Sequence, residues 1–428
     1  MNQLIETVKK NGKIKTFGYS MMPILQYGDV VSIQKVSLES LRINDIICFR
    51  QKNRLVTHRV VYKTKSYVIT KGDNNPVSDG KILKNKILGK ISAIERKEQK
   101  FDIDDLYLFQ SSIYFEEIKR VVGMFKKAGI DQVILKGLPL HLFLEKKHQR
   151  RIYADCDILV AKKDCFRARN LLKNEGYQKV DFPLSSKHKK LKDKDVEESF
   201  VKKISGYTVV FDIHYEAAFM MTQLGKLEYL YPQKLLEDFT KSLLNNKRIV
   251  EIEDGKFPLL SLEEQIVYLF LHLFHHNFRG GYRYDILVKI LGMPFDKNKL
   301  IHIITEYKLT NFVYPGLMLL NEYYPDEKYQ KLFGLLTVSK QVRKYVSKKV
   351  LPIRIFDGEE RIGAGTKRFL LIFNLSQIPF YIKILTFLNK QVIYSIYWVF
   401  VKKTRQFILQ KFPFLRPLLQ RRAAEFKR

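Results

Sequence analysis

Residues 134–139 read ILKGLP, and this stretch decides the fold of the middle of the chain. An apolar run that ends at a glycine predicts a strand over residues 132–135, and the segment after the turn predicts a helix over residues 139–147. A helix that begins directly after a strand presents free N–H groups, which suit the phosphate of a nucleotide. The stretch therefore predicts an α/β unit with a phosphate contact at Gly137.

The next motif, DCDILV at residues 155–160, predicts a further strand. Because side chains at positions i and i+2 of a strand face the same way, Asp155 and Asp157 direct their carboxylates to one place. Two like charges at close range are unfavourable unless a divalent cation lies between them. Asp212, in another predicted strand at residues 207–214, supplies a third acid. These residues together predict a metal site.

The sequence on either side of these motifs indicates a multidomain chain. Residues 1–98 alternate on a two-residue period between turns and predict an all-β domain, and the charged residues 95–105 mark its end. Residues 105–255 form the predicted central α/β core, and residues 256–350 its helical extension. Residues 365–428 predict basic amphipathic helices at the C-terminal end.

Several elements are predicted within these domains. The expected strands of the first domain lie at residues 30–34, 45–50, 55–62 and 67–70. An amphipathic helix is expected over residues 114–128. The helical extension is expected to begin after Ser261, because Glu263 and Glu264 follow this capping residue in the first turn.

The first domain carries short motifs in a fixed order, namely GYSMMP at 18–23, GD at 28–29, NDI at 44–46, VTHRV at 56–60, KGDNNP at 71–76 and SDG at 78–80. A serine becomes a nucleophile only when a neighbouring base accepts its proton and a third group orients that base. Ser20, His58 and either Asp73 or Asp79 provide these groups if folding brings them together. Otherwise Ser20 is a turn serine, His58 a packing or surface residue, and both aspartates are turn formers. Lys71 is an alternative base.

These motifs, over residues 14–95, resemble the signal peptidase I superfamily, in the archaeal and ER-like branch whose base is histidine rather than lysine. The resemblance implies a serine peptidase in which Ser20 is the nucleophile and His58 the general base. It implies that Asp79, or with less weight Asp73, orients the imidazole. It also implies that the Ser20 N–H donates to the oxyanion of the acyl-transfer step.

The sequence departs from that superfamily in two respects. Tyr19 stands where relatives often have Gly, and Gly18 stands where many have a Ser that assists the oxyanion hole. Residues 1–17 are polar and basic and lack the usual apolar membrane anchor. We therefore expect a specialised or soluble peptide or protein substrate rather than bulk secretory precursors.

Residues 105–330, with the motifs LKG, DxDxLV and DIH in that order, resemble an uncharacterised nucleotidyltransferase family found near peptide-modification genes. The resemblance implies Mg²⁺ as cofactor and a nucleoside triphosphate as substrate. The implied site residues are Asp155, Asp157 and Asp212 for the metal, and Lys136, Gly137 and Arg151 for the nucleotide. Bound Mg²⁺ aligns a triphosphate and stabilises charge on the leaving pyrophosphate. Leu138 departs from the Ser or Gly of better-characterised members.

Three histidines, His272, His275 and His276, lie on a predicted apolar helix. Two interpretations are open: a metal site, or structural residues in a polar pocket. Asp285 is an expected hydrogen-bond partner for one of them.

Charge is the strongest feature of the composition, with 76 Lys and Arg against 44 Asp and Glu and a net charge of +32. Such a surface favours nucleotides, acidic peptides or an anionic membrane, with nucleic acid as a less favoured partner. The aromatic and basic tail from residue 366 suits either an interfacial helix on anionic lipid or a helix packed on the protein.

The cysteines and the hydropathy bear on location. Cys48, Cys156 and Cys165 show neither metal nor disulfide spacing, which predicts a reducing compartment. No apolar run reaches the roughly 18 residues of a membrane span, and no signal peptide is present. These features predict a cytoplasmic protein, or one peripheral to the inner face of the membrane.

The leading hypothesis is a bifunctional enzyme. Ser20 and His58 cleave a peptide or leader, and Asp155 and Asp157 with Mg²⁺ transfer a nucleotidyl group, both in peptide maturation. The alternative hypothesis is a non-catalytic protein with one or both sites decayed, which binds a peptide, nucleic acid or a membrane.

Overall fold

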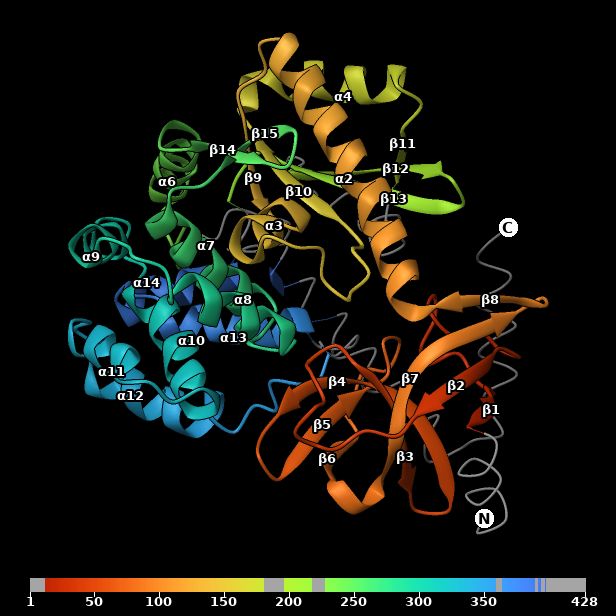
Figure 1. Cartoon of the computed structure of the whole chain (residues 1–428). Helices are drawn as coiled ribbons and strands as arrows, with labels where there is room; N and C mark the ends of the chain where they lie inside the picture. The colour runs from red at the N-terminus through yellow and green to blue at the C-terminus, as the bar shows by residue number, and fades with distance from the viewer. Residues whose placement is uncertain are drawn as a thin grey trace.

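The computed structural model describes residues 12–180, 196–217, 228–358, 364–388, 392–393 and 397. Two β-sheets stand apart in this structure, and the long helix α2 (Ile103–Lys127) runs from one to the other (Figure 1). Helices fill the side of the molecule next to both sheets. The architecture is therefore multidomain, with a β-rich N-terminal part, as predicted.

The N-terminal strands form one sheet in the order β1-β2-β7-β3-β4-β5-β6, with β8 paired to β7. Their bounds are β1 Lys13–Lys15, β2 Val30–Gln34, β3 Ile46–Gln51, β4 Arg54–Lys63, β5 Tyr67–Lys71, β6 Gly80–Leu83, β7 Ile87–Arg96 and β8 Gln99–Asp102. The four predicted strands are confirmed to within one residue at each end. The sheet is antiparallel throughout, which agrees with the two-residue alternation in the sequence.

The end of this sheet differs from the prediction. The charged stretch 95–105 was expected to be a boundary, but Ala93 pairs with Asp102 and Glu95 with Lys100 in a β7–β8 hairpin. Its charged residues are the polar positions of an exposed hairpin rather than a linker. The sheet therefore continues to Asp102, beyond the predicted limit of residue 98.

The central sheet has the strand order β11-β12-β13-β10-β9-β15-β14. The strands are β9 Gln132–Lys136, β10 Cys156–Val160, β11 Gln178–Val180, β12 Glu197–Ile204, β13 Tyr207–His214, β14 Arg248–Ile252 and β15 Gly255–Leu259. The accompanying helices are α3 Leu138–Glu145, α4 Cys165–Asn174 and α6 Gln233–Asn245. The predicted strand–turn–helix unit and the strand at residues 207–214 are confirmed. Because β15 pairs with β9, the sheet continues past the predicted limit of residue 255.

Each face of the central sheet has its own core. Ile134, Ile158 and Phe211 pack with apolar residues of α2 and α4 on one face. Val133, Leu135 and Leu159 pack with the helical extension on the other face. Successive residues of a strand point to opposite faces, so the apolar runs in these strands reflect burial on both sides.

The helical extension begins at α7, where the Ser261 side chain accepts a hydrogen bond from the Glu264 N–H, as the capping pattern predicts. Its helices are α7 Leu262–His275, α8 Tyr282–Ile290, α9 Lys297–Glu306, α10 Thr310–Tyr323, α11 Glu327–Gly334 and α12 Lys340–Tyr345. A π-helical turn at Val346–Val350 follows them. These elements share one hydrophobic core with the central sheet.

The tail is described only in part. Helices α13 (Ala364–Leu375) and α14 (Phe380–Lys383) lie within the predicted region, and residues 398–428 lie outside the described residues. Phe369 and Ile372 are buried in the helical core, whereas Tyr381 is 73% exposed. The inner side of this segment thus packs on the protein, and the membrane partner stays a prediction. Across the described ranges, no helix is both long and apolar enough to cross a membrane.

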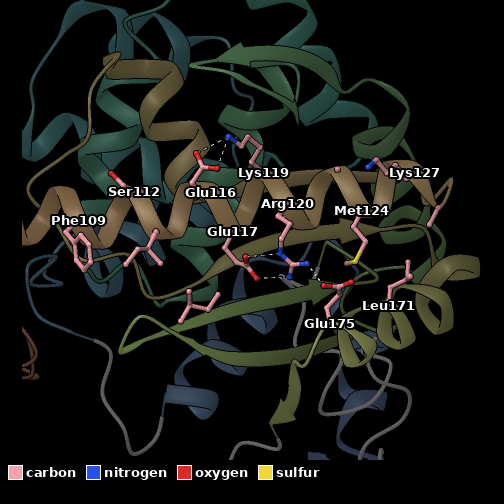
Figure 2. Close-up of a pocket in the computed structure, with 14 residues that line it drawn as sticks. Phe109, Ser112, Glu116, Glu117, Lys119, Arg120, Met124, Lys127, Leu171 and Glu175 are labelled. Atoms are coloured by element: carbon pink, nitrogen blue, oxygen red, sulfur yellow. Dashed lines mark hydrogen bonds and ion pairs between the residues drawn. The ribbon is translucent and has the colours of Figure 1, made fainter.

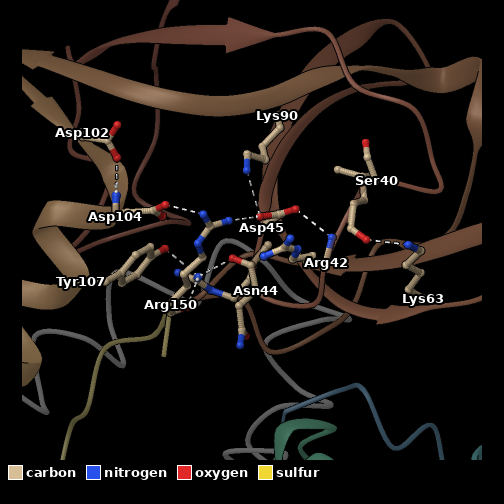
Figure 3. Close-up of polar contacts among 12 residues, drawn as sticks. Ser40, Arg42, Asn44, Asp45, Lys63, Lys90, Asp102, Asp104, Tyr107 and Arg150 are labelled. Atoms are coloured by element: carbon tan, nitrogen blue, oxygen red, sulfur yellow. Dashed lines mark hydrogen bonds and ion pairs between the residues drawn. The ribbon is translucent and has the colours of Figure 1, made fainter. Parts of the chain in front are cut away.

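The two sheets are joined by α2 and by ion pairs of Arg150, one of which involves a buried carboxylate. The first turns of α2 contribute Ile103 and Tyr107 to the core of the N-terminal domain, and the rest of the helix packs on the central sheet. Figure 3 shows Arg150 between Asp45 and Asp104, with Arg150 Nη1 2.7 Å from Asp45 Oδ1. The Asp45 side chain is 2% exposed. The two domains therefore share an interface with a buried charge.

A shallow groove runs along the outer face of α2 (Figure 2). Apolar side chains such as Phe109 and Met124 line it, together with an ion-pair network in which Arg120 bridges Glu117 and Glu175. None of the predicted site residues lines this groove. The groove is therefore separate from the predicted sites.

Replacing Arg150 by alanine is expected to lower the free energy of unfolding by about 1–3 kcal/mol, the usual penalty when a buried polar group loses a partner. Urea denaturation followed by tyrosine fluorescence measures this change. Lys119→Ala is the matched control, because its ion pairs with Glu116 and Asp254 are exposed and contribute about 1 kcal/mol or less. Equal losses in the two variants would contradict the role assigned to Arg150.

Candidate active sites

The structure brings Ser20, His58 and Asp79 into one hydrogen-bonded chain. His58 Nε2 lies 2.9 Å from Ser20 Oγ, and His58 Nδ1 lies 2.7 Å from Asp79 Oδ2. The side chains of His58 and Asp79 are 8% and 10% exposed. An ionised carboxylate only accepts hydrogen bonds, so Asp79 assigns the ring proton to Nδ1 and leaves the Nε2 lone pair for the serine hydroxyl. This is the geometry of an activated serine.

Local structure explains how these residues meet. His58 lies on β4, Ser20 lies in the turn before β2, and Asp79 directly precedes β6. Thr70 Oγ1 donates to Asp79 Oδ2 at 2.8 Å, and the Asp79 N–H donates to the Thr70 carbonyl at 2.8 Å. The carboxylate is therefore fixed both by its own backbone and by a neighbouring hydroxyl.

Asp73, the other predicted orienting residue, has a different partner. Its two carboxylate oxygens accept from Arg59 Nε at 2.8 Å and from Arg59 Nη2 at 2.6 Å. A carboxylate held by both arms of a guanidinium is not available to the imidazole. The assignment of Asp73 to His58 is therefore corrected, and Asp79 takes this position.

The alternative base, Lys71, is not hydrogen-bonded to the nucleophile. Lys71 Nζ donates to the Gly72 carbonyl at 3.3 Å, whereas the Ser20 hydroxyl contacts His58. Burial lowers the pKa of Lys71, and nearby Asp73 and Asp357 oppose the shift. The geometry favours histidine.

The second cluster joins Asp155, Asp157 and Asp212, each of which offers an oxygen within 4.8 Å of the others. Strands β10 and β13 are parallel, and Asp157 pairs in register with Asp212. Asp155 directly precedes β10 and reaches the same face, as the two-residue spacing predicts. The three carboxylates thus converge near the N-terminal end of β10, on two adjacent interior strands of the central sheet.

Lys136 reaches this cluster because of an irregularity in the sheet. Asp157 pairs with Lys136 of β9, but Ile158 pairs with Ile134, so one residue of β9 is skipped. The bulge turns Lys136 towards the acids. Lys136 Nζ forms an ion pair with Asp157 and lies 3.3 Å from Asp155 Oδ2. The predicted phosphate contact thus lies among the acids, where it provides positive charge.

The pKa values of the acids differ in a way that reflects their neighbours. Burial acts to raise the pKa of Asp157, but Lys136 and His214 outweigh it and lower the pKa to about 2. Burial and the Asp157 carboxylate together raise the pKa of Asp212 to about 7. Ser199 Oγ donates to Asp212 Oδ1 at 2.5 Å and opposes part of this shift. Without a cation, Asp212 therefore gains its proton as the pH falls through about 7, well above the range of an ordinary carboxyl group.

These features fit a Mg²⁺ ion. Mg²⁺ prefers carboxylate oxygens at about 2.1 Å, and three such oxygens already converge. Burial, and then the neighbouring Asp157 carboxylate, raise the pKa of Asp212, and a cation bound at the cluster would stabilise its ionised form. Asp155, Asp157 and Asp212 are therefore the residues that would hold the ion.

Two further residues belong to this site but had no predicted role. His214 Nε2 lies 3.0 Å from Asp157 Oδ1, and His214 Nδ1 lies 3.9 Å from Glu197 Oε2. Burial acts to lower the pKa of His214, but Asp157 and Glu197 raise it overall. His214 could have been predicted from the sequence, because it is the last residue of the DIH motif that contains Asp212. Glu197 has no local motif, since its position depends on the pairing of β12 with β13.

The other two predicted nucleotide contacts, Gly137 and Arg151, lie in surroundings that differ from each other. Gly137 has φ 111° at the start of α3, and a Cβ there would lie 3.5 Å from the Asp155 carbonyl oxygen. Arg151 stacks between the rings of Tyr153 and Tyr282, with centroid distances of 5.0 and 5.1 Å. Gly137 therefore adjoins the acid cluster, and a nucleotide contact for Arg151 stays a prediction.

The histidines of α7 form a packed set. His272 Nε2 lies 3.2 Å from His276 Nε2, and the His272 ring stacks on Tyr268. Burial lowers the pKa of both His272 and His276 well below the ordinary value, so both rings are neutral. The one three-residue metal-binding group found in the described ranges is the acid cluster, which favours the structural interpretation. Asp285 accepts from Tyr324 at 3.1 Å instead of from a histidine, which corrects that expectation.

A strand–glycine–helix unit, with paired acids on the adjacent strand and a third acid on its parallel neighbour, defines a nucleotidyltransferase-like domain. The chain belongs to the family described as uncharacterised nucleotidyltransferase, whose model matches residues 107–325. This match begins within α2 and does not include the N-terminal sheet.

One similar solved structure is that of an antigenic nucleotidyltransferase-like protein from Paracoccidioides brasiliensis. It is 12% identical, covers 52% of this chain and 92% of its own, and has a TM-score of 0.34. No match was found among curated proteins.

The shifted pKa of Asp212 predicts how stability depends on pH in the metal-free protein. The pKa of Asp212 is about 7 in the folded protein and 3.8 ordinarily, so the folded state binds this proton more tightly than the unfolded state does. The free energy of unfolding therefore decreases as the pH rises from about 4 to about 7, and above pH 7 the ionised Asp212 imposes a constant penalty on the folded state. Asp212→Asn removes this penalty. In EDTA, the variant should melt several degrees above the wild type at pH 8, and the difference should shrink towards pH 4.

Thermal unfolding over this pH range measures the effect, and Asp238→Asn on the exposed face of α6 is the control. Added Mg²⁺ should raise the melting temperature of the wild type at pH 8 more than that of Asp212→Asn. A pH-independent difference between variant and wild type would contradict the assignment.

Proposed function

We propose that this protein is a bifunctional enzyme, with a serine endopeptidase in the N-terminal domain and a Mg²⁺-dependent nucleotidyltransferase in the middle. The single observation that carries the peptidase proposal is the 2.9 Å contact between Ser20 Oγ and His58 Nε2, with Asp79 on the far side of the ring. Family membership and the acid cluster support the transferase. Both activities would act in the maturation of a peptide.

The peptidase step follows from the hydrogen bonds. Ser20 Oγ attacks the carbonyl carbon of the peptide bond while His58 Nε2 takes its proton. Asp79 stabilises the imidazolium that results, and His58 then gives the proton to the leaving amine. Water, activated by the same imidazole, releases the acyl group and restores Ser20.

The surroundings of Ser20 support a peptide substrate. No hydrogen bond within the described part of the chain uses the Ser20 N–H, which suits its proposed role as an oxyanion donor. Tyr19 is 65% exposed and stacks on Tyr27, with ring centroids 6.0 Å apart. These rings offer an apolar contact for a peptide next to the nucleophile.

The transferase step relies on the central sheet. Bound Mg²⁺ supplies electrostatic stabilisation of the charge that develops on a triphosphate. His214 orients Asp157, and the start of α3 presents its N–H groups near Gly137. Lys136 adds positive charge at the same cluster, which favours an anionic nucleotide. The acceptor is unspecified.

Ser20→Ala is expected to abolish labelling by a fluorophosphonate probe, because the probe reacts only with an activated serine hydroxyl. Peptide hydrolysis should fall by about 10³-fold or more. The matched control is Ser40→Ala, which removes an exposed hydroxyl far from the triad in sequence and should label like the wild type. Unchanged labelling of Ser20→Ala would reject the peptidase and favour a protein that only binds peptides.

The double variant Asp155→Asn/Asp157→Asn tests the transferase. Calorimetric titration with each common nucleoside triphosphate in Mg²⁺ should show binding to the wild type, and binding should weaken at least about tenfold in the variant, as expected when metal coordination is lost. Asp238→Asn serves again as the control. Binding that is equal in all three proteins, or independent of Mg²⁺, would eliminate the metal site.

A further inference from the structure

The loop at residues 72–79, here called the triad loop, touches the catalytic residues at both of its ends. The Asn74 N–H donates to the Ser20 carbonyl at 2.8 Å, and Asp79 holds the ring of His58. Gly72 packs so closely that a Cβ there would lie 2.9 Å from His58 Nε2. The distance between hydroxyl and imidazole therefore depends on the conformation of this loop.

Two residues from a distant part of the chain, Asp357 and Gly358, form hydrogen bonds with the triad loop at Ser78 and Pro76. Asp357 Oδ1 accepts from the Ser78 N–H at 2.9 Å and from Ser78 Oγ at 2.8 Å. The Gly358 N–H donates to the Pro76 carbonyl at 2.8 Å. Asp357 is 5% exposed, so water does not replace these bonds readily. A carboxylate 279 residues away along the chain thus binds the residue next to the catalytic aspartate.

The segment that carries Asp357 is itself fixed to the helical extension. The Gly280 N–H donates to the carbonyl oxygens of Ile355 at 2.7 Å and of Asp357 at 3.1 Å. Phe356 covers Gly281, where a Cβ would lie only 2.4 Å from its ring. Gly280 and Gly281 lie in the connection between α7 and α8, and Gly281 directly precedes α8, so the segment that carries Asp357 is fixed to the helices that pack against the central sheet.

The charge on Asp357 is also balanced. Arg354 Nε lies 3.5 Å and Arg279 Nη1 lies 3.7 Å from Asp357 Oδ2. One oxygen of the carboxylate therefore faces cations of the helical extension, and the other faces the triad loop. Such a carboxylate is held in one orientation, which is the requirement for positioning another group.

We infer that Asp357 is a positioning residue for the serine peptidase, an inference that rests on the proposed peptidase function. It holds the triad loop so that Asp79 stays on His58 and Asn74 stays on Ser20. The peptidase site is thus completed by the segment that follows the helical extension and is hydrogen-bonded to it. Because Asp357 is buried and lies behind the loop, its loss should slow the acyl-transfer step without weakening substrate binding.

Asp357→Ala is the first test. The second-order rate of fluorophosphonate labelling and kcat for a peptide substrate should fall by about 10- to 100-fold, the range that small displacements of a reacting group produce. KM should stay within about twofold, since no substrate contact is removed. Asp357→Asn should restore most of the rate, because the amide oxygen still accepts both hydrogen bonds from Ser78.

Tyr62→Phe is the matched control. It removes a 2.9 Å hydrogen bond to the Tyr323 carbonyl, which joins the same two parts of the protein but does not involve the triad loop. Its rates should equal those of the wild type. Melting temperatures of all variants identify any loss of folding. If Asp357→Ala does not fold, Ser78→Ala replaces it, with an expected fall of about two- to fivefold.

The outcomes separate the two proposals. Wild-type rates in Asp357→Ala or its replacement, or a change confined to KM, would overturn the positioning role and leave the peptidase intact. Failure of Asp357→Asn to recover activity in a folded protein would also overturn it. Absence of Ser20 labelling in the wild type would instead remove the peptidase proposal, and the inference with it.

Discussion

A buried positive charge at Arg59 is the interaction on which the arrangement of the N-terminal site depends. Its guanidinium binds both oxygens of Asp73 and donates to Tyr107 of α2 at 2.7 Å. It also donates to the carbonyl oxygens of Asn44 and Arg150. One side chain next to His58 thus joins β4, the triad loop, the connecting helix and the central domain. A guanidinium has five donors in a fixed plane, which allows it to join so many elements.

The position of the acids on β10 is a second constraint. This strand is buried on both faces, so a ligand could reach Asp155 and Asp157 only near the end of the strand. Residues 156, 158 and 160 of β10 face the core shared with α2, whereas Asp157 and Leu159 face the helical extension. The acids are therefore placed at the end of the strand, where the helical core gives way to polar side chains. The bulge that turns Lys136 to the same face supplies the nearest positive charge. Helix α7 carries the stacked rings of Tyr268 and His272, which are uncharged.

Local sequence predicted the parts of both sites that depend on local periodicity. Alternation identified the strands around His58, and the spacing of Asp155 and Asp157 placed both on one face. The resemblance preferred Asp79 over Asp73, and the contact of Asp79 with His58 agrees with that preference, but the pairing of Asp73 with Arg59 had no local signal because both aspartates lie in turn sequences. The charged residues 95–105 were predicted to mark the end of the first domain, but residues 99–102 still belong to its sheet, because an exposed hairpin has the same charged composition as a domain boundary. Asp357 gives no local signal at all, because its function is a contact between distant segments.

The strong positive charge of the chain gives a physical reason for the charged contacts that join its domains. In a chain with 76 basic and 44 acidic residues, a buried acid readily finds a cationic partner, as Asp45 and Asp157 both do. Exposed cations of the described part of the chain, such as Lys234 and Lys241, make a surface that favours anionic ligands. Buried acids with paired cations also fix how one domain meets the other, as Arg150 and Asp357 show. Buried charges of this kind therefore align the parts of the protein, because the Arg150–Asp45 pair joins the two sheets and the Asp357–Ser78 contact joins the helical side of the molecule to the turn that carries Asp79.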